Sequence, residues 1–257
     1  MPDVIEPAAE TVERREGPYG EVVLRRRGGH FEIIANGCFL MDTSDGRSER
    51  LLIRAALDAL TGGATTDGAP ADPVSADPAP ADPVSADPAP AGGLSVLIGG
   101  LGVGFSLAEA AAEPRWGRIT VVERERAVVD WHRGGHLAPF SAGALDDPRV
   151  TVVERDLLDH LRGAHGAHDA LCLDIDNGPD WTVTESNDSL YSPGGLAGCL
   201  RALTPGGVLA VWSARPSTRF EDALRAAGFA EVQTIPVPVA RGVPDAVHLA
   251  RRPSGPT

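Results

Sequence analysis

The sequence predicts an α/β protein with a doubly wound, mostly parallel, seven-stranded sheet and a small N-terminal β-hairpin subdomain. Three observations predict this fold. Short apolar runs alternate with helical segments from residue 94 onward. The first of these runs breaks into a glycine-rich turn at residues 99–104, which leads directly into an alanine-rich helical segment. Before them, residues 20–41 carry the apolar runs and glycine-containing turns of an antiparallel hairpin.

The polar start of the chain and the hairpin are expected to behave differently. Residues 1–19 are rich in acidic and polar side chains, so we expect a flexible tail. Residues 20–61 are expected to form the subdomain, with tight turns at Gly28-Gly29 and Asn36-Gly37. Leucines recur on one face of residues 48–60, which predicts a helix that closes the subdomain.

Residues 62–93 form a compositional break between the subdomain and the rest of the chain. The decapeptide at residues 71–80 recurs unchanged at residues 81–90 and consists of Ala, Asp, Pro, Val and Ser. Proline at this density removes amide donors and prevents helix formation. We therefore expect a disordered, solvated insert without a core of its own.

Residues 94–252 are predicted to form one Rossmann-like nucleoside-binding domain, followed by a short tail at 253–257. The predicted strands lie at 95–99, 118–123, 149–153, 169–174, 207–213, 229–236 and 245–250. The predicted helices lie at 104–112, 125–133, 156–162, 194–202 and 218–227. The first five strands suit buried parallel positions, and the last two suit an antiparallel edge hairpin. This order resembles the class I S-adenosylmethionine-dependent transferases more closely than the dehydrogenases.

Composition excludes several classes of function. The formal net charge of -13 argues against nucleic acid or an anionic membrane as a partner. No apolar run approaches the roughly 18 residues of a membrane span. The N-terminus is acidic and lacks the basic and apolar regions of a signal peptide, so none is expected. The chain contains no lysine, which excludes Schiff-base chemistry on a lysine. The three cysteines are widely spaced, so we expect reduced thiols in the cytoplasm and no metal site.

The carboxyl ends of the first three parallel strands carry residues suited to a nucleoside. In a doubly wound sheet the ligand lies outside these ends. The turn after the first strand lets the backbone approach the ligand closely. Glu123 ends the second strand and can accept hydrogen bonds from ribose hydroxyls. Asp156 follows the third strand. Asp156 is placed to meet an adenine amino group or to cap the next helix. The predicted glycines of the turn are Gly99, Gly100, Gly102 and Gly104.

The end of the fourth parallel strand is strongly acidic. It reads Leu-Asp-Ile-Asp-Asn-Gly-Pro-Asp-Trp from residue 173 to residue 181. Asp174 is placed to act as a general base, since neighbouring acids raise its pKa and suit it to an amine. Asp176, Asn177 and Tyr191 are candidate substrate contacts. The alternative is an ordinary turn built from Asp, Asn, Gly and Pro.

Taken together, the hairpin, glycine-rich turn, Glu123, Asp156 and the acidic stretch resemble the polyamine aminopropyltransferases, the spermidine synthase family. The resemblance implies that Glu123 binds ribose, that Asp156 contacts adenine and that Asp174 deprotonates the attacking amine. It also implies decarboxylated S-adenosylmethionine as co-substrate, a small amine as acceptor, no metal and a possible homodimer.

The chain departs from the family pattern in two places. Asn177 stands where a second aspartate is usual. The Gln and the Tyr-His-Glu cluster that the family's N-terminal segment supplies near the sulfonium and amine sites are not intact here. Asp45 or Glu49 are candidates to replace this cluster. We therefore keep two alternatives, a methyltransferase that uses S-adenosylmethionine and a non-catalytic nucleoside-binding relative. A nicotinamide-dependent dehydrogenase is disfavoured by the antiparallel ending of the sheet.

Overall fold

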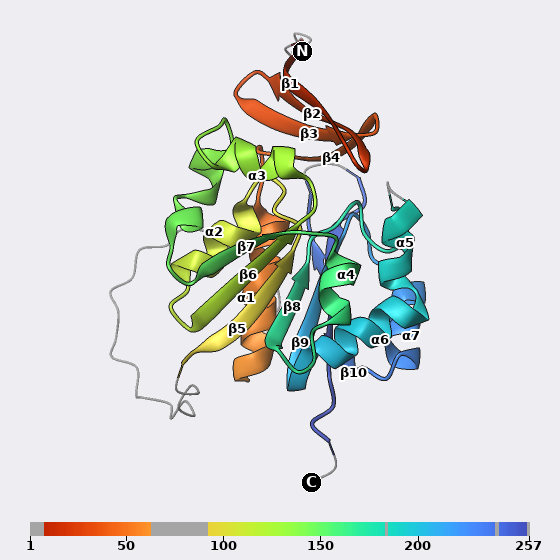
Figure 1. Cartoon of the computed structure of the whole chain (residues 1–257). Helices are drawn as coiled ribbons and strands as arrows, with labels where there is room; N and C mark the ends of the chain where they lie inside the picture. The colour runs from red at the N-terminus through yellow and green to blue at the C-terminus, as the bar shows by residue number, and fades with distance from the viewer. Residues whose placement is uncertain (1–7, 63–91, 183–184, 240–241, 256–257) are drawn as a thin grey trace, which may run out of the picture.

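The N-terminal part of the molecule is a four-stranded antiparallel sheet (Figure 1). The computed structural model describes residues 8–62, 92–182, 185–239 and 242–255. The strands pair in chain order, and the predicted turns at Gly28-Gly29 and Asn36-Gly37 join the second, third and fourth. The four strands are β1 (Ala9–Gly17), β2 (Gly20–Arg27), β3 (His30–Ala35) and β4 (Cys38–Asp42).

Strand β1 corrects the expectation of a flexible tail over residues 1–19. Residues 9–17 pair with β2 along its whole length, while residues 1–7 lie outside the described part of the chain. The strand escaped prediction because its side chains are mostly charged, so it lacks an apolar alternation. Its arginines and glutamates form ion pairs instead, as in Arg14 with Glu21 and Arg26 with Glu10.

The main sheet has seven strands in the order β10-β11-β9-β8-β5-β6-β7. Strands β5 to β9 are parallel, and β11 is antiparallel to both of its neighbours. The last two strands do form a hairpin, but β11 lies inside the sheet between β9 and β10. The strands are β5 (Leu94–Gly99), β6 (Trp116–Glu123), β7 (Val150–Glu154), β8 (His168–Leu173), β9 (Leu203–Ser213), β10 (Ala230–Val237) and β11 (Asp245–Arg251).

Helices cover both faces of the main sheet, so it has two apolar cores. One face is covered by α1 (Arg47–Thr61), α2 (Phe105–Ala112) and α3 (Arg126–His132). The other is covered by α4 (Leu157–Arg162), α6 (Pro193–Ala202) and α7 (Thr218–Ala226), with α5 (Glu185–Tyr191) packed on α6. The short helices α5, η1 (Ala138–Ser141) and η2 (Ala144–Asp146) were not predicted.

Helix α1 does not close the N-terminal subdomain, as we expected, but belongs to the main sheet. It packs against β8, β9 and β11 and runs beside α2. Its leucine stripe explains this position: Leu52, Ile53 and Ala56 are fully buried in the core on that face. The predicted insert at residues 62–93 follows this helix, and residues 63–91 of it lie outside the described part of the chain.

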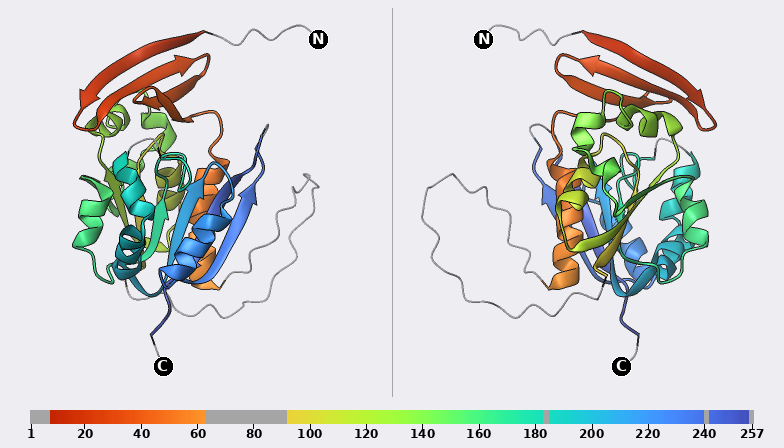
Figure 2. Two further views of the ribbon diagram at one scale, coloured as in Figure 1. Left: turned by 90° about the vertical axis from the view of Figure 1, so that its right-hand side faces the viewer. Right: turned by 60° about the vertical axis from the view of Figure 1, so that its left-hand side comes forward.

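The N-terminal sheet stands over the carboxyl ends of the parallel strands (Figure 2). Two polar contacts fasten β1 to α3. The indole N–H of Trp131 donates to Glu13 Oε2 over 2.7 Å, and Arg15 Nη1 lies 2.6 Å from Asp130 Oδ2. The N-terminal sheet therefore covers the edge of the main sheet where a ligand is expected.

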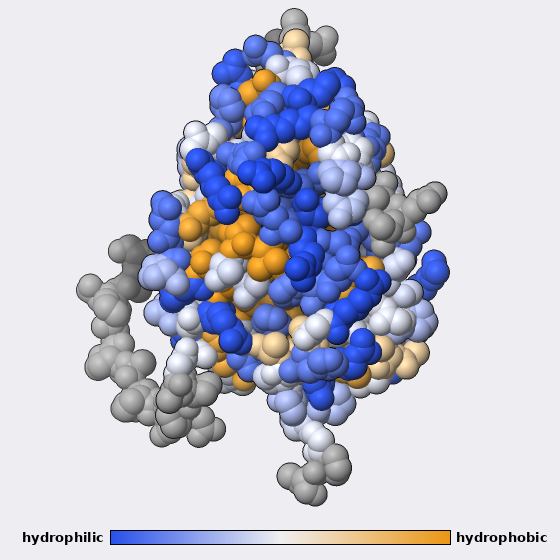
Figure 3. Space-filling view, in the orientation of Figure 1, coloured by the Kyte–Doolittle hydropathy of each residue, from blue (hydrophilic) through white to orange (hydrophobic). Residues whose placement is uncertain are grey.

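Polar side chains dominate the outer surface of the N-terminal sheet, whereas apolar surface gathers on the face shown in Figure 3, around β7 and the segments before it. Leu145, Val150 and Val152 of this region are partly buried against the core. Within the described residues, no helix is both long and apolar enough to cross a membrane.

Candidate active site

A pocket lies between the N-terminal sheet and the carboxyl ends of β5, β6, β7 and β8. It encloses about 890 Å³ of empty space, counting its open mouth. The N-terminal sheet supplies an apolar wall that includes Val22, Ile33 and Met41. The main domain supplies the polar residues Glu123, Arg124, Glu125, Arg155, Asp156, Asp174, Asp176 and Asn187, together with Gly100 and Gly102.

The glycine-rich turn forms the floor of the pocket at two of its four predicted glycines. Gly100 has a φ of +89°, and a Cβ there would lie 2.4 Å from the carbonyl oxygen of Asp174. Gly102 has a φ of +49°, and its Cβ would lie 2.3 Å from Met41 Sδ. Gly99 and Gly104 belong to the turn but do not line the pocket. Gly99 packs under it, and Gly104 precedes the first residue of α2.

His132 holds the turn from below and was not identified from the sequence. Its Nε2 lies 2.9 Å from the carbonyl oxygen of Gly102, and its Nδ1 lies 3.2 Å from Ser141 Oγ. A carbonyl only accepts hydrogen bonds, so Nε2 must carry the proton. Burial lowers the pKa of His132 and keeps the ring neutral. A single histidine on a short helix carries no motif, so no sequence signal could have identified it.

Glu123 lies at the end of β6, as predicted, and its carboxylate is held by the backbone. Oε2 accepts from the N–H of Leu101 over 2.8 Å, and Oε1 accepts from the N–H of Glu125 over 2.8 Å. Burial raises the pKa of Glu123, while these backbone donors act in the opposite direction. An ionised carboxylate offers about four acceptor positions, so two remain for hydroxyl groups of a ligand.

Asp156 fulfils the helix-capping alternative and also lines the pocket. Its Oδ1 accepts from the N–H groups of Leu158 and Asp159, over 2.9 and 3.2 Å, at the start of α4. Both bonds use the same oxygen. The capping role therefore fixes the orientation of the carboxylate and is compatible with a ligand contact at Oδ2.

Asp174 follows β8 on the opposite side of β5 from Glu123. Its backbone N–H donates to the carbonyl oxygen of Gly99 over 2.9 Å, and Ser106 Oγ lies 3.2 Å from its Oδ2. Loss of hydration raises its pKa to about 6, and the nearby charge of Asp245 acts in the same direction. Asp174 is therefore mostly ionised at neutral pH and close to the range in which it can exchange protons.

Two further carboxyl groups lie beside Asp174. Glu49 on α1 is buried, and desolvation together with the charge of Asp174 raises its pKa to about 8. Ser48 Oγ lies 3.0 Å from Glu49 Oε2 and also hydrogen-bonds Asp245, whose pKa is raised by burial. Glu49, a sequence candidate to replace the missing Tyr-His-Glu cluster, thus lies beside Asp174. A signal existed for this placement, because residue 49 shares its helical face with Leu52, Ile53 and Ala56.

The three predicted substrate residues are not brought to one place. Asp176 lines the pocket, and its Oδ2 accepts from Asn187 Nδ2 over 2.7 Å. Asn177 is buried away from the pocket lining, and its carbonyl oxygen accepts from the N–H of Ala214. Tyr191 packs edge-on against Phe220 and lines a separate surface pocket. The turn after β8 therefore directs the adjacent side chains of Asp176 and Asn177 to different sides, and Tyr191 lies apart from both on α5.

Comparison with curated proteins identifies relatives of part of the chain. No family model matches it. The polyamine aminopropyltransferase of Mycobacterium tuberculosis is 36% identical over 148 residues, which are 54% of this chain and 27% of that protein. The polyamine aminopropyltransferase of Salmonella arizonae is 34% identical over 115 residues, 44% of this chain and 37% of that protein. The chain therefore spans well under half the length of either relative.

Comparison with solved structures extends the likeness to the whole fold. A spermidine synthase in complex with the transition-state analogue AdoDATO aligns with a TM-score of 0.70 at 15% identity, over 94% of this chain and 73% of that one. The spermidine synthase of Thermotoga maritima aligns with a TM-score of 0.68 at 13% identity, over 94% and 72% of the two chains. Sequence and fold together relate this chain to the spermidine synthase family, the polyamine aminopropyltransferases.

Proposed function

We propose that this protein is an alkyltransferase of the spermidine synthase type, which moves the aminopropyl group of decarboxylated S-adenosylmethionine to a small amine. The observation that carries the proposal is a single pocket with Glu123 and Asp156 on one side of β5 and Asp174 on the other. This arrangement suits a nucleoside at one end and a reacting amine at the other. The names of the sequence relatives support the same assignment.

Asp174 is proposed as the base. An amine reaches the pocket as an ammonium ion and must lose one proton before its lone pair can attack carbon. Asp174 accepts that proton, the new C–N bond forms as the C–S bond breaks, and the electron pair of the C–S bond stays on sulfur. The sulfonium becomes the neutral thioether methylthioadenosine, and one proton is released overall. Because a sulfonium is already an activated leaving group, positioning of the two reactants supplies most of the acceleration.

The carboxyl group of Glu49 completes this site. With a pKa of about 8 for Glu49 and about 6 for Asp174, the pair retains one proton and one negative charge near neutral pH. One negative charge matches one ammonium group of the acceptor. Burial raises the pKa of the carboxyl groups and lowers the pKa of an enclosed ammonium. The pKa of the ammonium that gives up the proton is therefore closer to that of Asp174, which accepts it.

Methyl transfer from S-adenosylmethionine is the second candidate, and one observation favours it. The glycine-rich turn presents only two side chains, Leu101 and Val103, and both are buried. No carboxylate of the turn would therefore repel the carboxylate of S-adenosylmethionine, and none would bind the ammonium of its decarboxylated form. Asp174 and Asp176 would have to bind that ammonium.

Calorimetric titration with the two sulfonium compounds, methylthioadenosine and NAD separates these functions. We expect methylthioadenosine to bind, decarboxylated S-adenosylmethionine to bind at least about tenfold more tightly than the carboxylated form, and NAD not to bind. Mass spectrometry of products formed with a panel of amines then identifies the group transferred. The opposite ranking of the two sulfonium compounds, with methylated products, would replace the first proposal by the second. Binding of NAD alone would overturn both.

A further inference from the structure

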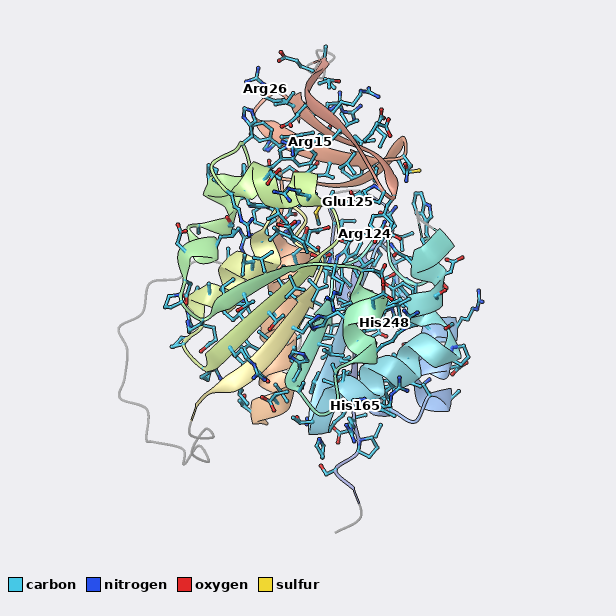
Figure 4. All side chains as sticks on the ribbon, viewed as in Figure 1. Arg15, Arg26, Arg124, Glu125, His165 and His248 are labelled. Atoms are coloured by element: carbon cyan, nitrogen blue, oxygen red, sulfur yellow. The ribbon has the colours of Figure 1, made fainter. Side chains whose placement is uncertain are left out.

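Arg124, directly after Glu123, reaches across the rim of the pocket. Its Cζ lies 4.6 Å from the centre of the Tyr19 ring, and its Nη1 donates to Asn187 Oδ1 over 3.1 Å. The side chain is only 16% exposed, and its Nε lies 3.6 Å from the Glu125 carboxylate. Figure 4 shows Arg124 and Glu125 where the N-terminal sheet meets the main sheet. Arg124 therefore joins three separate parts of the chain.

The contact to Asn187 continues to the reacting end of the pocket. Asn187 on α5 uses its Oδ1 for Arg124 and its Nδ2 for Asp176 Oδ2, the second bond being 2.7 Å long. Asp176 has a φ of +52°, a left-handed conformation that a residue with a side chain rarely adopts. The side-chain amide of Asn187 thus holds a strained aspartate, and Tyr19, Arg124, Asn187 and Asp176 all line the pocket.

The two ends of this chain of contacts have different neighbours. Arg124 and Tyr19 lie beside Glu123, at the end proposed for the nucleoside. Asp176 lies two residues beyond Asp174, at the end proposed for the amine. A guanidinium group is planar, so it can stack on an aromatic ring through its face while it donates hydrogen bonds from its edge. A ligand that orders Arg124 will therefore also order Asn187 and the carboxylate of Asp176.

We propose that Arg124 is a nucleoside-positioning residue, and that the bridge from Tyr19 through Arg124 and Asn187 to Asp176 couples nucleoside binding to amine binding. The nucleoside orders the bridge, and the ordered bridge presents Asp176 to the amine. This inference rests on the proposed function, because it uses the same two ligand classes. The coupling is a property of this chain's own contacts, and by linkage it is reciprocal: each ligand must tighten binding of the other by the same factor.

The test is calorimetry with methylthioadenosine and 1,4-diaminobutane, each alone and in the presence of the other. The unmodified protein is expected to bind each ligand at least about fivefold more tightly when the other is present, which is the lower end of common allosteric couplings. Asn187→Ala is expected to bind both ligands without this enhancement. Arg124→Ala is expected to weaken methylthioadenosine binding about tenfold and also to remove the enhancement.

Two further variants keep the test decisive. Arg124→Lys retains the charge and most of the bulk, but lacks the planar group, so it should behave like Arg124→Ala without any loss of folding. Arg126→Ala, two residues away and 75% exposed, should bind as the unmodified protein does. Independent binding of the two ligands by the unmodified protein, binding of the nucleoside alone, or an enhancement that survives in Asn187→Ala would overturn the coupling. No binding of methylthioadenosine by the unmodified protein would overturn the proposed function and the coupling with it.

Discussion

Asp174 lines the pocket and Glu49 is buried beside it, and the two carboxyl groups cannot both be ionised at low cost. Glu49 is buried on α1, and Asp174 faces the cavity from the end of β8. Burial and the charge of Asp174 raise the pKa of Glu49 to about 8, and burial together with the charge of Asp245 raises the pKa of Asp174 to about 6. The residue that faces the cavity thus remains the more acidic one, as the proposed base must, while its neighbour keeps a proton near neutral pH.

Replacing Asp174 by asparagine is expected to remove the base and leave the nucleoside end intact. Turnover should fall at least about 100-fold, the smaller end of the usual contribution of general base catalysis. Affinity for methylthioadenosine should change less than about twofold. In the unmodified protein kcat should rise with pH through about 6, since only ionised Asp174 accepts a proton. Asp159→Asn, an exposed residue on α4, is the matched control, and unchanged turnover in Asp174→Asn would remove Asp174 from the mechanism.

Glu49→Gln is expected to stabilise the protein at alkaline pH. The pKa of Glu49 is raised in the fold, so its contribution to stability is complete below about 4.5 and is lost as pH rises through about 8. The uncharged amide avoids this loss. At pH 9 the variant should exceed the unmodified protein by roughly 2–4 kcal/mol of unfolding free energy, with little difference at pH 5. Urea denaturation at both pH values measures this, with exposed Glu16→Gln as control. Equal stabilities at pH 9 would show that the fold does not raise the pKa of Glu49.

At the scale of elements, the glycine-rich turn depends on its supports. Helix α3 contributes His132, which binds the carbonyl oxygen of Gly102, and β4 contributes Met41, which touches Gly102 from the pocket side. Met41 Sδ also lies 3.2 Å from the N–H of Val103. The turn is therefore held between two elements from opposite sides, and its shape depends on both of them.

Truncation of His132 is expected to loosen the turn. His132→Ala leaves the part-buried Gly102 carbonyl without its His132 partner and removes a buried ring, which together cost about 2–4 kcal/mol of stability. Methylthioadenosine binding should weaken about tenfold, because the floor of the pocket is no longer fixed. His165→Ala, on the exposed surface at the other end of the sheet in Figure 4, is the control. Calorimetry and thermal denaturation give the two readouts, and unchanged nucleoside affinity would contradict the supporting role of His132.

At the scale of the whole molecule, the pocket exists only because the N-terminal sheet is docked on the main sheet. The apolar wall formed by Val22, Ile33 and Met41 comes from the smaller sheet, and Glu123, Asp156 and Asp174 come from the larger one. Docking depends in part on Glu13, whose carboxylate accepts from the indole of Trp131 and pairs with Arg15. Arg15 also pairs with Asp130 on α3.

Glu13→Ala is expected to weaken this docking. The buried indole N–H of Trp131 loses its acceptor, which costs about 1–3 kcal/mol of unfolding free energy. Tyr19 follows β1, so nucleoside affinity should fall as well. Glu10→Ala is the matched control on the same strand, since Glu10 is 68% exposed and pairs with exposed Arg26. Urea denaturation and methylthioadenosine titration would contradict this account if the two variants behaved alike.

Most strands of the main sheet and the helices that cover it can be predicted from local sequence patterns. Apolar runs, glycine turns and capping residues such as Asp156 act over a few residues, so the predicted strands and helices from residue 94 onward match the structure closely. Strand β1 was missed because its side chains are mostly charged and show no apolar alternation, although ion pairs such as Arg14 with Glu21 join it to β2. Helix α1 was assigned to the wrong sheet because an apolar stripe does not specify which surface it will cover.

The sequence by itself determined the order of strands and helices, the glycine turn and the acids that end the parallel strands, because each depends on short-range sterics and hydrogen bonding. Only the tertiary structure decided that Glu49 lies beside Asp174, that His132 supports Gly102 and that Arg124 bridges Tyr19 to Asn187. These pairs are separated by many residues, and their proximity results from the packing of whole elements. Packing also separated Asn177 and Tyr191 from the pocket, since Asn177 is buried next to Asp176 in the turn and Tyr191 packs on Phe220 from α5.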